Sequence, residues 1–275
     1  MFQITKAEQH TDTIFSREIR SAPIAKAVLP GQFVIVTVNP NEPPLPLPIS
    51  DFNRQNDTFT VTCEAADPLR QHLMSLQKGD SVFDCTGPFA EPSRIDTLNT
   101  VVCIAGGIGS AALFPLVREY KSNDCDVISI VGFKTADKIF LNKQISKHSD
   151  EFYVTTNDGS YGIKGRVTTA LRAILQSNKD IERVVVIGSL QMMKACVNIT
   201  AAHEIPTRVS LAAMIADDIW RSGRMQIAKE PQQSLSFMER LEFDAKQLDL
   251  ESLITLEKQH AETEEETLPE ETDAS

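Results

Sequence analysis

Hydrophobic and polar positions follow one pattern up to about residue 95 and another beyond it. In the first part, short runs rich in β-branched and aromatic residues alternate with clusters of Pro, Gly, Asn and Asp, which is typical of strands joined by turns. Leu69, Leu73 and Leu76 have helical spacing instead. Many short strands in so short a stretch predict a small antiparallel β-barrel. The predicted strands are residues 2–9, 11–19, 31–38, 58–65 and 80–86, with a helix over 67–77.

The second part alternates apolar runs of strand length with segments of helical spacing. Strands that alternate with helices predict βαβ units and a doubly wound parallel sheet, the α/β architecture of nucleotide-binding domains. The predicted strands are residues 100–107, 127–133, 151–158, 183–189 and 207–213, and the predicted helices are 110–122, 136–149, 165–178 and 191–204. We interpret residues 214–230 as a loop with a short hairpin and residues 236–259 as one helix or two.

These patterns divide the chain into a barrel domain of residues 1–97, an α/β domain of residues 98–211, a segment of residues 212–250 and a tail of residues 251–275. The tail holds nine acids and one base, so it carries −8 of the formal charge of −11. Such a charge run predicts a solvated, disordered tail, for which simple solubility is the plainest role.

Composition excludes several classes of protein. The negative balance argues against a nucleic-acid partner, because nothing offsets phosphate repulsion. The sequence contains no run of 18 apolar residues, so it predicts no membrane-spanning helix. Its first residues do not resemble a secretory signal. The five cysteines form no Cys-x-x-Cys pair, which indicates free thiols in a reducing cytoplasm. No histidine or cysteine spacing indicates a metal site.

Three glycine-containing loops are candidates for binding a nucleotide. Gly106, Gly107 and Gly109 follow an apolar strand and open a helix, where backbone N–H groups can approach a pyrophosphate. A tight strand-to-helix turn is the alternative interpretation. Gly188 directly follows another predicted strand, at the edge of the sheet where ligands bind in open α/β folds.

The third loop covers residues 155–162, and its hydroxyl groups and glycines suit a ribose or a nicotinamide. Its alternative interpretation is an ordinary polar loop. Loops at the same ends of parallel strands share one crevice, so together they favour a cofactor site. The candidate residues of this loop are Thr155, Asp158 and Gly159.

Seven stretches resemble the ferredoxin–NADP reductase superfamily. The likeness is strongest to small electron-transfer subunits, such as those of dihydroorotate dehydrogenase, sulfide dehydrogenase and, above all, the α subunit of NADH-dependent ferredoxin:NADP oxidoreductase. The resemblance implies FAD on the barrel, NAD(P)H on the α/β domain and a [2Fe–2S] cluster near the C-terminus that passes electrons to a larger partner. The stretches are PGQFV (30–34), KGD (78–80), GPF (87–89), TVVCIAGGIGSAALFPL (100–116), YVTTNDGSYGIKG (153–165), RVVVIGSLQMMKA (183–195) and VSL (209–211).

The cluster segment departs from the family pattern. Ser222 and Met225 fall where the resemblance expects the paired cysteines, and Phe237 falls near the later one. Only Asp217 fits a ligand position. Because such clusters need thiolates or comparably strong donors, we expect no [2Fe–2S] cluster and no metal in this chain.

The flavin contacts depart as well. Leu47 stands where the resemblance expects an Arg that binds the FAD pyrophosphate, and a Leu cannot make that charge-assisted contact. At the pyrophosphate loop, Asp67 repels phosphate and Arg70 compensates in part. Ser50 would face the flavin, beside the turn formed by Gly87 and Pro88. NAD(P) is therefore the expected cofactor, and the sequence leaves the retention of FAD open.

Two hypotheses follow. In the first, the chain is an electron-transfer subunit that passes electrons between NAD(P)H and a larger redox subunit, a flavoprotein or an iron–sulfur protein, through FAD if FAD is retained. In the second, it is a non-catalytic scaffold of a redox complex that has lost flavin and cluster, since fold alone does not imply activity. The sequence does not distinguish NAD from NADP or identify the partner.

Overall fold

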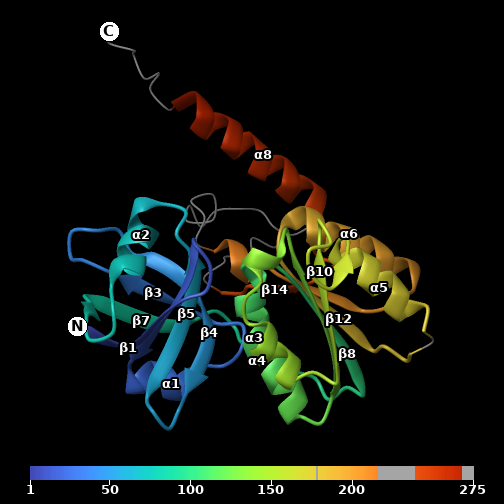
Figure 1. Ribbon diagram of the computed structural model, residues 1–275, viewed down its shortest axis with the longest axis horizontal. Helices are drawn as coiled ribbons and strands as arrows, with labels where there is room; N and C mark the ends of the chain where they lie inside the picture. Colours follow the sequence, from blue (N-terminus) through green and yellow to red (C-terminus); the bar gives the residue numbers. More distant parts are fainter. Residues whose placement is uncertain (178, 216–238, 268–275) are drawn as a thin grey trace.

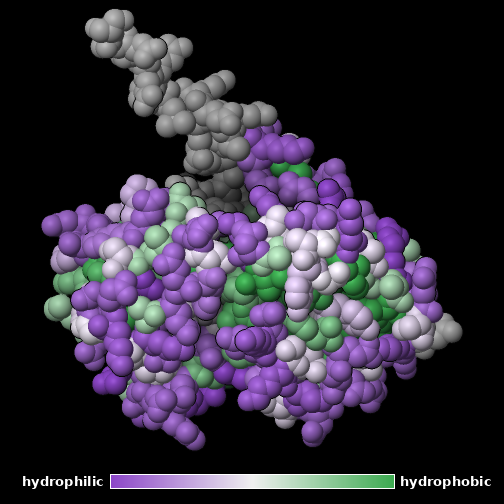
Figure 2. Space-filling view, viewed as in Figure 1, coloured by the Kyte–Doolittle hydropathy of each residue, from purple (hydrophilic) through white to green (hydrophobic). Residues whose placement is uncertain are grey.

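The computed structural model describes residues 1–177, 179–215 and 239–267, with residues 260–267 described by their backbone alone. Its strands form two seven-stranded sheets that lie side by side (Figure 1). Hydrophilic side chains cover most of the face in Figure 2, and apolar side chains gather near its middle, where the two domains meet.

The first sheet is an antiparallel barrel with the strand order β6-β1-β2-β5-β4-β3-β7. Its end strands β6 and β7 are separated in sequence by Phe83 alone, so the sheet curls until its two edges almost meet. The barrel is filled by apolar side chains such as Phe15, Leu47 and Phe59. This architecture confirms the predicted barrel. Its strands are β1 (Phe2–Gln9), β2 (Ile14–Arg20), β3 (Phe33–Thr37), β4 (Leu45–Asn53), β5 (Thr58–Glu64), β6 (Ser81–Val82) and β7 (Asp84–Phe89).

Strand β4 was not predicted, because its prolines favour a loop. The strand pairs with β3 over residues 45–48 but with β5 only from Ile49 onward. The N–H of Ile49 donates to the carbonyl of Gln32 at 3.1 Å. Backbone groups alternate along a strand, so Pro46 and Pro48 turn their nitrogens toward the edge that has no partner there, and no ladder hydrogen bond is lost.

Two helices accompany the barrel. Helix α2 (Pro68–Ser75) agrees with the predicted helix, and the Asp67 carboxylate caps it by accepting from the Arg70 N–H at 2.8 Å. Helix α1 (Ala22–Ala27) was missed, because six residues are too few for a hydrophobic period to be recognised.

The second sheet has the order β11-β10-β9-β8-β12-β13-β14 and is parallel except for β14. Helices α3 and α4 pack on the side of the barrel, and α5 and α6 lie on the other side (Figure 1). This is the predicted doubly wound sheet. Its strands are β8 (Thr100–Gly106), β9 (Asp126–Phe133), β10 (Glu151–Thr156), β11 (Ile163–Lys164), β12 (Arg183–Ile187), β13 (Thr207–Ser210) and β14 (Glu242–Asp244); its helices are α3 (Gly109–Ser122), α4 (Asn142–Lys147), α5 (Val167–Leu175) and α6 (Leu190–Ala202), with short 3₁₀ turns η1 (Ala136–Lys138) and η2 (Ala212–Met214).

The predicted helix over residues 136–149 is broken in the structure. Residues 139–141 separate the 3₁₀ turn η1 from helix α4, and the last of them, Leu141, has a left-handed φ of 55°. The break lets Phe140 turn inward, where its ring lies 5.6 Å from the ring of His10 on the barrel. The contact between domains therefore overrides the local helical pattern.

The C-terminal part needs two corrections. Residues 242–244 were predicted as helix but form β14, because Leu241 and Phe243 are buried against the sheet. Residues 251–267 of the predicted disordered tail belong to helix α8 (Leu250–Thr267), which agrees with the predicted helix of residues 236–259 as far as residue 259 and extends beyond it. Glu, Leu, Lys and Ala are strong helix formers, and the buried Leu253 anchors the helix. The predicted loop over 214–230, the cluster positions Asp217, Ser222, Met225 and Phe237, and residues 268–275 lie outside the described residues, apart from Met214 and Ile215.

Two further properties concern the described residues. No described helix is both long and apolar enough for a membrane crossing. All five cysteines are buried free thiols, and burial raises the pKa of Cys63, Cys85 and Cys196 to about 12. These thiols are therefore protonated and poorly reactive near neutral pH.

Candidate nucleotide-binding site

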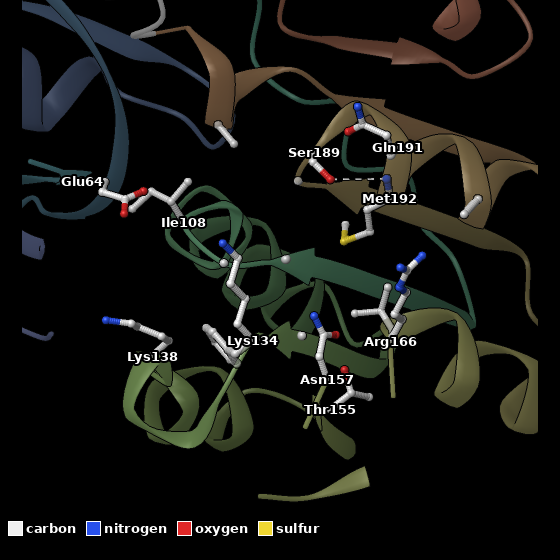
Figure 3. Close-up of a pocket in the computed structure, with 18 of the residues that line it drawn as sticks. Glu64, Ile108, Lys134, Lys138, Thr155, Asn157, Arg166, Ser189, Gln191 and Met192 are labelled. Atoms are coloured by element: carbon white, nitrogen blue, oxygen red, sulfur yellow. Dashed lines mark hydrogen bonds between the residues drawn. The ribbon is translucent and has the colours of Figure 1, made fainter. Parts of the chain in front are cut away.

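A pocket of about 690 Å³ lies at the carboxyl ends of β8, β9, β10 and β12. The connections after these strands form most of its wall, and Thr13, Ile14 and Glu64 of the barrel close one side (Figure 3). Ligands of open α/β sheets bind at this edge, and the volume lies within the range of small-molecule sites. Four of the predicted site residues line this pocket: Gly106, Gly107, Thr155 and Gly188.

The turn between β8 and α3 exposes backbone to the pocket. Gly107 has a left-handed φ of 52°, and a Cβ added there would meet no atom within 4 Å, so the turn needs a glycine for its conformation and leaves open space in front of it. The N-cap residue Ile108 gives no side-chain hydrogen bond to the first turn of α3, and that turn has no acidic residue. This helix end is therefore suited to an anion.

Gly109 has a different role from its neighbours. A Cβ there would lie 2.6 Å from the carbonyl oxygen of Ile187, so this glycine allows α3 to pack closely on β12. It does not line the pocket.

Met192 is a pocket residue that the sequence did not reveal. It follows the turn at Gly188, where Ser189 caps α6 by accepting from the Met192 N–H at 3.4 Å. A Cβ on Gly106 would lie 2.5 Å from the Met192 sulfur, and a Cβ on Gly188 would lie 2.5 Å from its methyl carbon. The two glycines thus make room for a flexible apolar side chain at the pocket wall (Figure 3).

Of the three residues predicted in the loop after β10, only one lines the pocket. Thr155 lines the pocket, and its buried hydroxyl has no partner among the described residues. Asp158 and Gly159 do not line it. The Asp158 carboxylate accepts from the N–H of Ser160 at 3.0 Å and from its hydroxyl at 2.7 Å, and these bonds lower the pKa of Asp158. Asp158 therefore shapes the loop, while its neighbour Asn157 faces the pocket.

Charged side chains complete the wall. Lys134, Lys138 and Arg166 line the pocket after β9, at η1 and before α5 (Figure 3). Glu64 and Glu257 are the carboxylates among the described lining residues. Sequence reasoning missed all five, since single charged residues in loops have no characteristic spacing.

The predicted flavin residues lie elsewhere. Ser50 lines a separate cavity of about 240 Å³ between the barrel and helices α3 and α4. Its hydroxyl donates to the Thr60 carbonyl at 3.1 Å and lies 2.7 Å from the Thr62 hydroxyl. Gly87 and Pro88 are in β7 and line neither pocket.

The phosphate contacts implied for FAD do not fit the residues present. Leu47 is fully buried in the barrel core. At the start of α2, the Asp67 carboxylate already caps the helix and pairs with Arg70 Nε at 2.6 Å, so an acidic side chain takes the place that a phosphate would need. The larger pocket offers an open glycine turn, three cations and a Thr155 hydroxyl with no partner among the described residues, a set of groups that suits a nicotinamide nucleotide.

Comparison with known proteins agrees with this geometry, although no family model matches the chain. A probable electron transfer subunit of dihydroorotate dehydrogenase B from Methanopyrus kandleri is 32% identical over 188 residues, which cover 68% of this chain and 69% of that protein. The chain belongs to the family of these electron transfer subunits. A homolog of the subunit from Thermotoga maritima is 26% identical over 262 residues, covering 95% of this chain and 92% of that protein.

Solved structures agree with the family assignment. A chain of the NADH-dependent reduced ferredoxin-NADP oxidoreductase, described for flavin-based electron bifurcation, superposes with a TM-score of 0.85 and 25% identity over 96% of this chain and 95% of that one. A ferredoxin NADP+ reductase from Neisseria gonorrhoeae with bound FAD and NADP has a TM-score of 0.60 and 19% identity over 73% and 89%, which shows the shared fold.

Proposed function

We propose that this member of the electron transfer subunit family binds NAD(P)H in the pocket at the end of the parallel sheet and passes its electrons to a partner subunit. The observation that carries the proposal is the pocket of about 690 Å³, with its open Gly107 turn and the unpaired Thr155 hydroxyl. The names of the relatives support the role of an electron-transfer subunit. A larger redox subunit, a flavoprotein or an iron–sulfur protein in the cytoplasm, is the proposed partner.

Each part of the pocket has a task in this proposal. The N–H groups at the start of α3 bind the pyrophosphate, and Lys134 and Arg166 supply positive charge. Thr155 offers a hydroxyl to a polar group of the nucleotide. When bound, the nicotinamide would supply two electrons as a hydride, and a flavin held by this chain or by the partner would have to accept it. The barrel side of the pocket, at Ile14, covers the nucleotide from water.

A scaffold without redox chemistry is the second candidate. It is favoured by the Asp67–Arg70 pair at α2 and by the buried Leu47, which together remove the phosphate contacts of FAD. In that case the fold would serve as an assembly surface.

A spectroscopic titration distinguishes the two candidates. The purified chain is titrated with NADH and NADPH by nicotinamide fluorescence, and its visible spectrum is recorded with and without added FAD. Saturable binding of either nucleotide supports the electron-transfer role, and a flavin band that NADH bleaches would exclude the scaffold. A colourless protein that binds neither nucleotide would exclude the electron-transfer role. Absorbance of a [2Fe–2S] cluster would contradict the expected loss of the cluster.

A further inference from the structure

Helix α8 reaches the nucleotide pocket although it lies outside the parallel sheet. It starts beside α6 and extends away from the body of the protein (Figure 1). Its first turns are fixed by the buried Leu253 and by an ion pair between Glu251 and Lys194 of α6. The start of α8 is therefore packed on the α/β domain.

Glu257 brings a carboxylate from this helix to the pocket. It lies four residues after Leu253, so both side chains share the face of α8 that meets the domain. Gln191 Nε2, in the first turn of α6, donates to Glu257 Oε2 at 3.1 Å. Among the described side chains, Oε1 of Glu257 has no hydrogen-bond partner, and the residue lines the pocket.

Two carboxylates and three cations lie on the described part of the pocket wall, and one of the carboxylates, Glu64, belongs to the barrel. Lys134 follows β9, Lys138 ends η1 and Arg166 precedes α5, whereas Glu257 lies beside the start of α6. Phosphate groups are repelled by a carboxylate, but ribose hydroxyls donate hydrogen bonds to one, which is how acidic residues bind ribose in dinucleotide sites. Phosphates therefore fit beside these cations, and a ribose fits beside Glu257.

We propose that Glu257 is a nucleotide-binding residue, which accepts hydrogen bonds from a ribose of NAD(P)H and so makes the acidic helix α8 part of the binding site. This inference rests on the proposed function, because it concerns the same pocket.

The test measures dissociation constants of the full chain for NADH and for inorganic pyrophosphate. Glu257→Ala is expected to weaken NADH binding about ten- to a hundredfold, the effect of losing a hydrogen bond to a charged group. Pyrophosphate has no ribose, and its negative charge is repelled by the Glu257 carboxylate, so its affinity should not fall. Glu257→Gln keeps an accepting oxygen and should lie between wild type and Glu257→Ala.

Glu251→Ala is the matched control, because it removes an ion pair of α8 outside the pocket. Glu251→Ala should leave the NADH affinity within about twofold of wild type, which would show that weaker anchoring of α8 does not account for the effect of Glu257→Ala. The inference is overturned if Glu257→Ala leaves NADH affinity unchanged, strengthens it, or weakens NADH and pyrophosphate equally. If the wild-type chain binds neither NADH nor NADPH, the proposed function is contradicted, and so is the inference that rests on it.

Discussion

At the scale of single residues, neighbouring glycines of one motif meet different physical demands. Gly107 has a left-handed backbone and faces open space, whereas Gly109 lies against the backbone of β12. The sequence assigned both to the cofactor, because a glycine pattern records small size but not which neighbour requires it. Thr155 was found by its place at a strand end. Lys134 and Arg166 were missed, because only the folded chain brings these loops together.

Substituting these two glycines should separate binding from stability. Gly107→Ala forces an L residue into the left-handed region, at about 1–2 kcal/mol, and places a methyl group in front of the pocket, so NADH affinity should fall. Gly109→Ala pushes Cβ against the rigid carbonyl of Ile187 and should lower the free energy of unfolding by about 1–3 kcal/mol. Urea unfolding and NADH titration measure the two effects. A Gly109→Ala protein as stable as wild type would contradict the packing role.

At the scale of elements, apolar periodicity predicts the structure wherever a strand or helix is packed on the sheet in the ordinary way. The strands β8, β9 and β12 and the helices α3 and α6 were found for this reason. The pattern failed at β4, where prolines face an unpaired edge, and at residues 136–149, where Phe140 contacts the barrel. In both cases the deciding contact is with a segment distant in sequence, which no local window contains.

Helix α3 should also hold the two domains together through Arg118. Its guanidinium pairs with Asp51 of β4 and lies 4.6 Å from the centre of the Phe52 ring. Arg118→Ala removes an ion pair and a cation–π contact that are partly shielded from water, and should cost about 1–3 kcal/mol of unfolding free energy. Arg94→Ala removes an exposed pair with Asp96 and is the matched control, with an expected cost below about 1 kcal/mol. Equal losses in both variants would argue against the role of Arg118.

At the scale of the whole molecule, the acidic C-terminal part is more than a solubilising tail. Its charge predicted disorder and its apolar spacing predicted a helix up to residue 259, and in the structure helix α8 uses Leu250 and Leu253 to pack on the α/β domain. Composition measures the average character of a segment, and here two apolar residues decide its structure. The two-domain fold of the family was predicted from the sequence. The path of residues 239–250, which pair with residue 91 and then add β14 to the sheet, was not predicted.

The contact between the domains should depend on pH through His10. Its ring packs on Phe140 of the α/β domain, and its Nε2 lies 2.6 Å from the Ser16 hydroxyl. Burial lowers the pKa of His10, partly opposed by Glu8. The unfolded chain therefore takes up this proton first as pH falls, so stability should be lost as pH falls through about 6.5 toward the lowered pKa.

Urea unfolding between pH 7.5 and pH 5.5 (about one unit on each side of the usual histidine pKa) measures this effect. His10→Gln should flatten the pH dependence, whereas His203→Gln, a change at an exposed histidine, should leave it as in the wild type. The role of His10 would be refuted if the two variants had the same pH profile.

The short strand β14 has a consequence for the behaviour of the protein in solution. It covers the outer edge of β13, and the residues just before it pair with the barrel, since the Glu91 N–H donates to the Glu239 carbonyl at 2.6 Å. Uncovered strand edges are templates on which other chains add strands. Because the three paired residues of β14 occupy this edge, we expect β13 to be closed to strand addition by another chain.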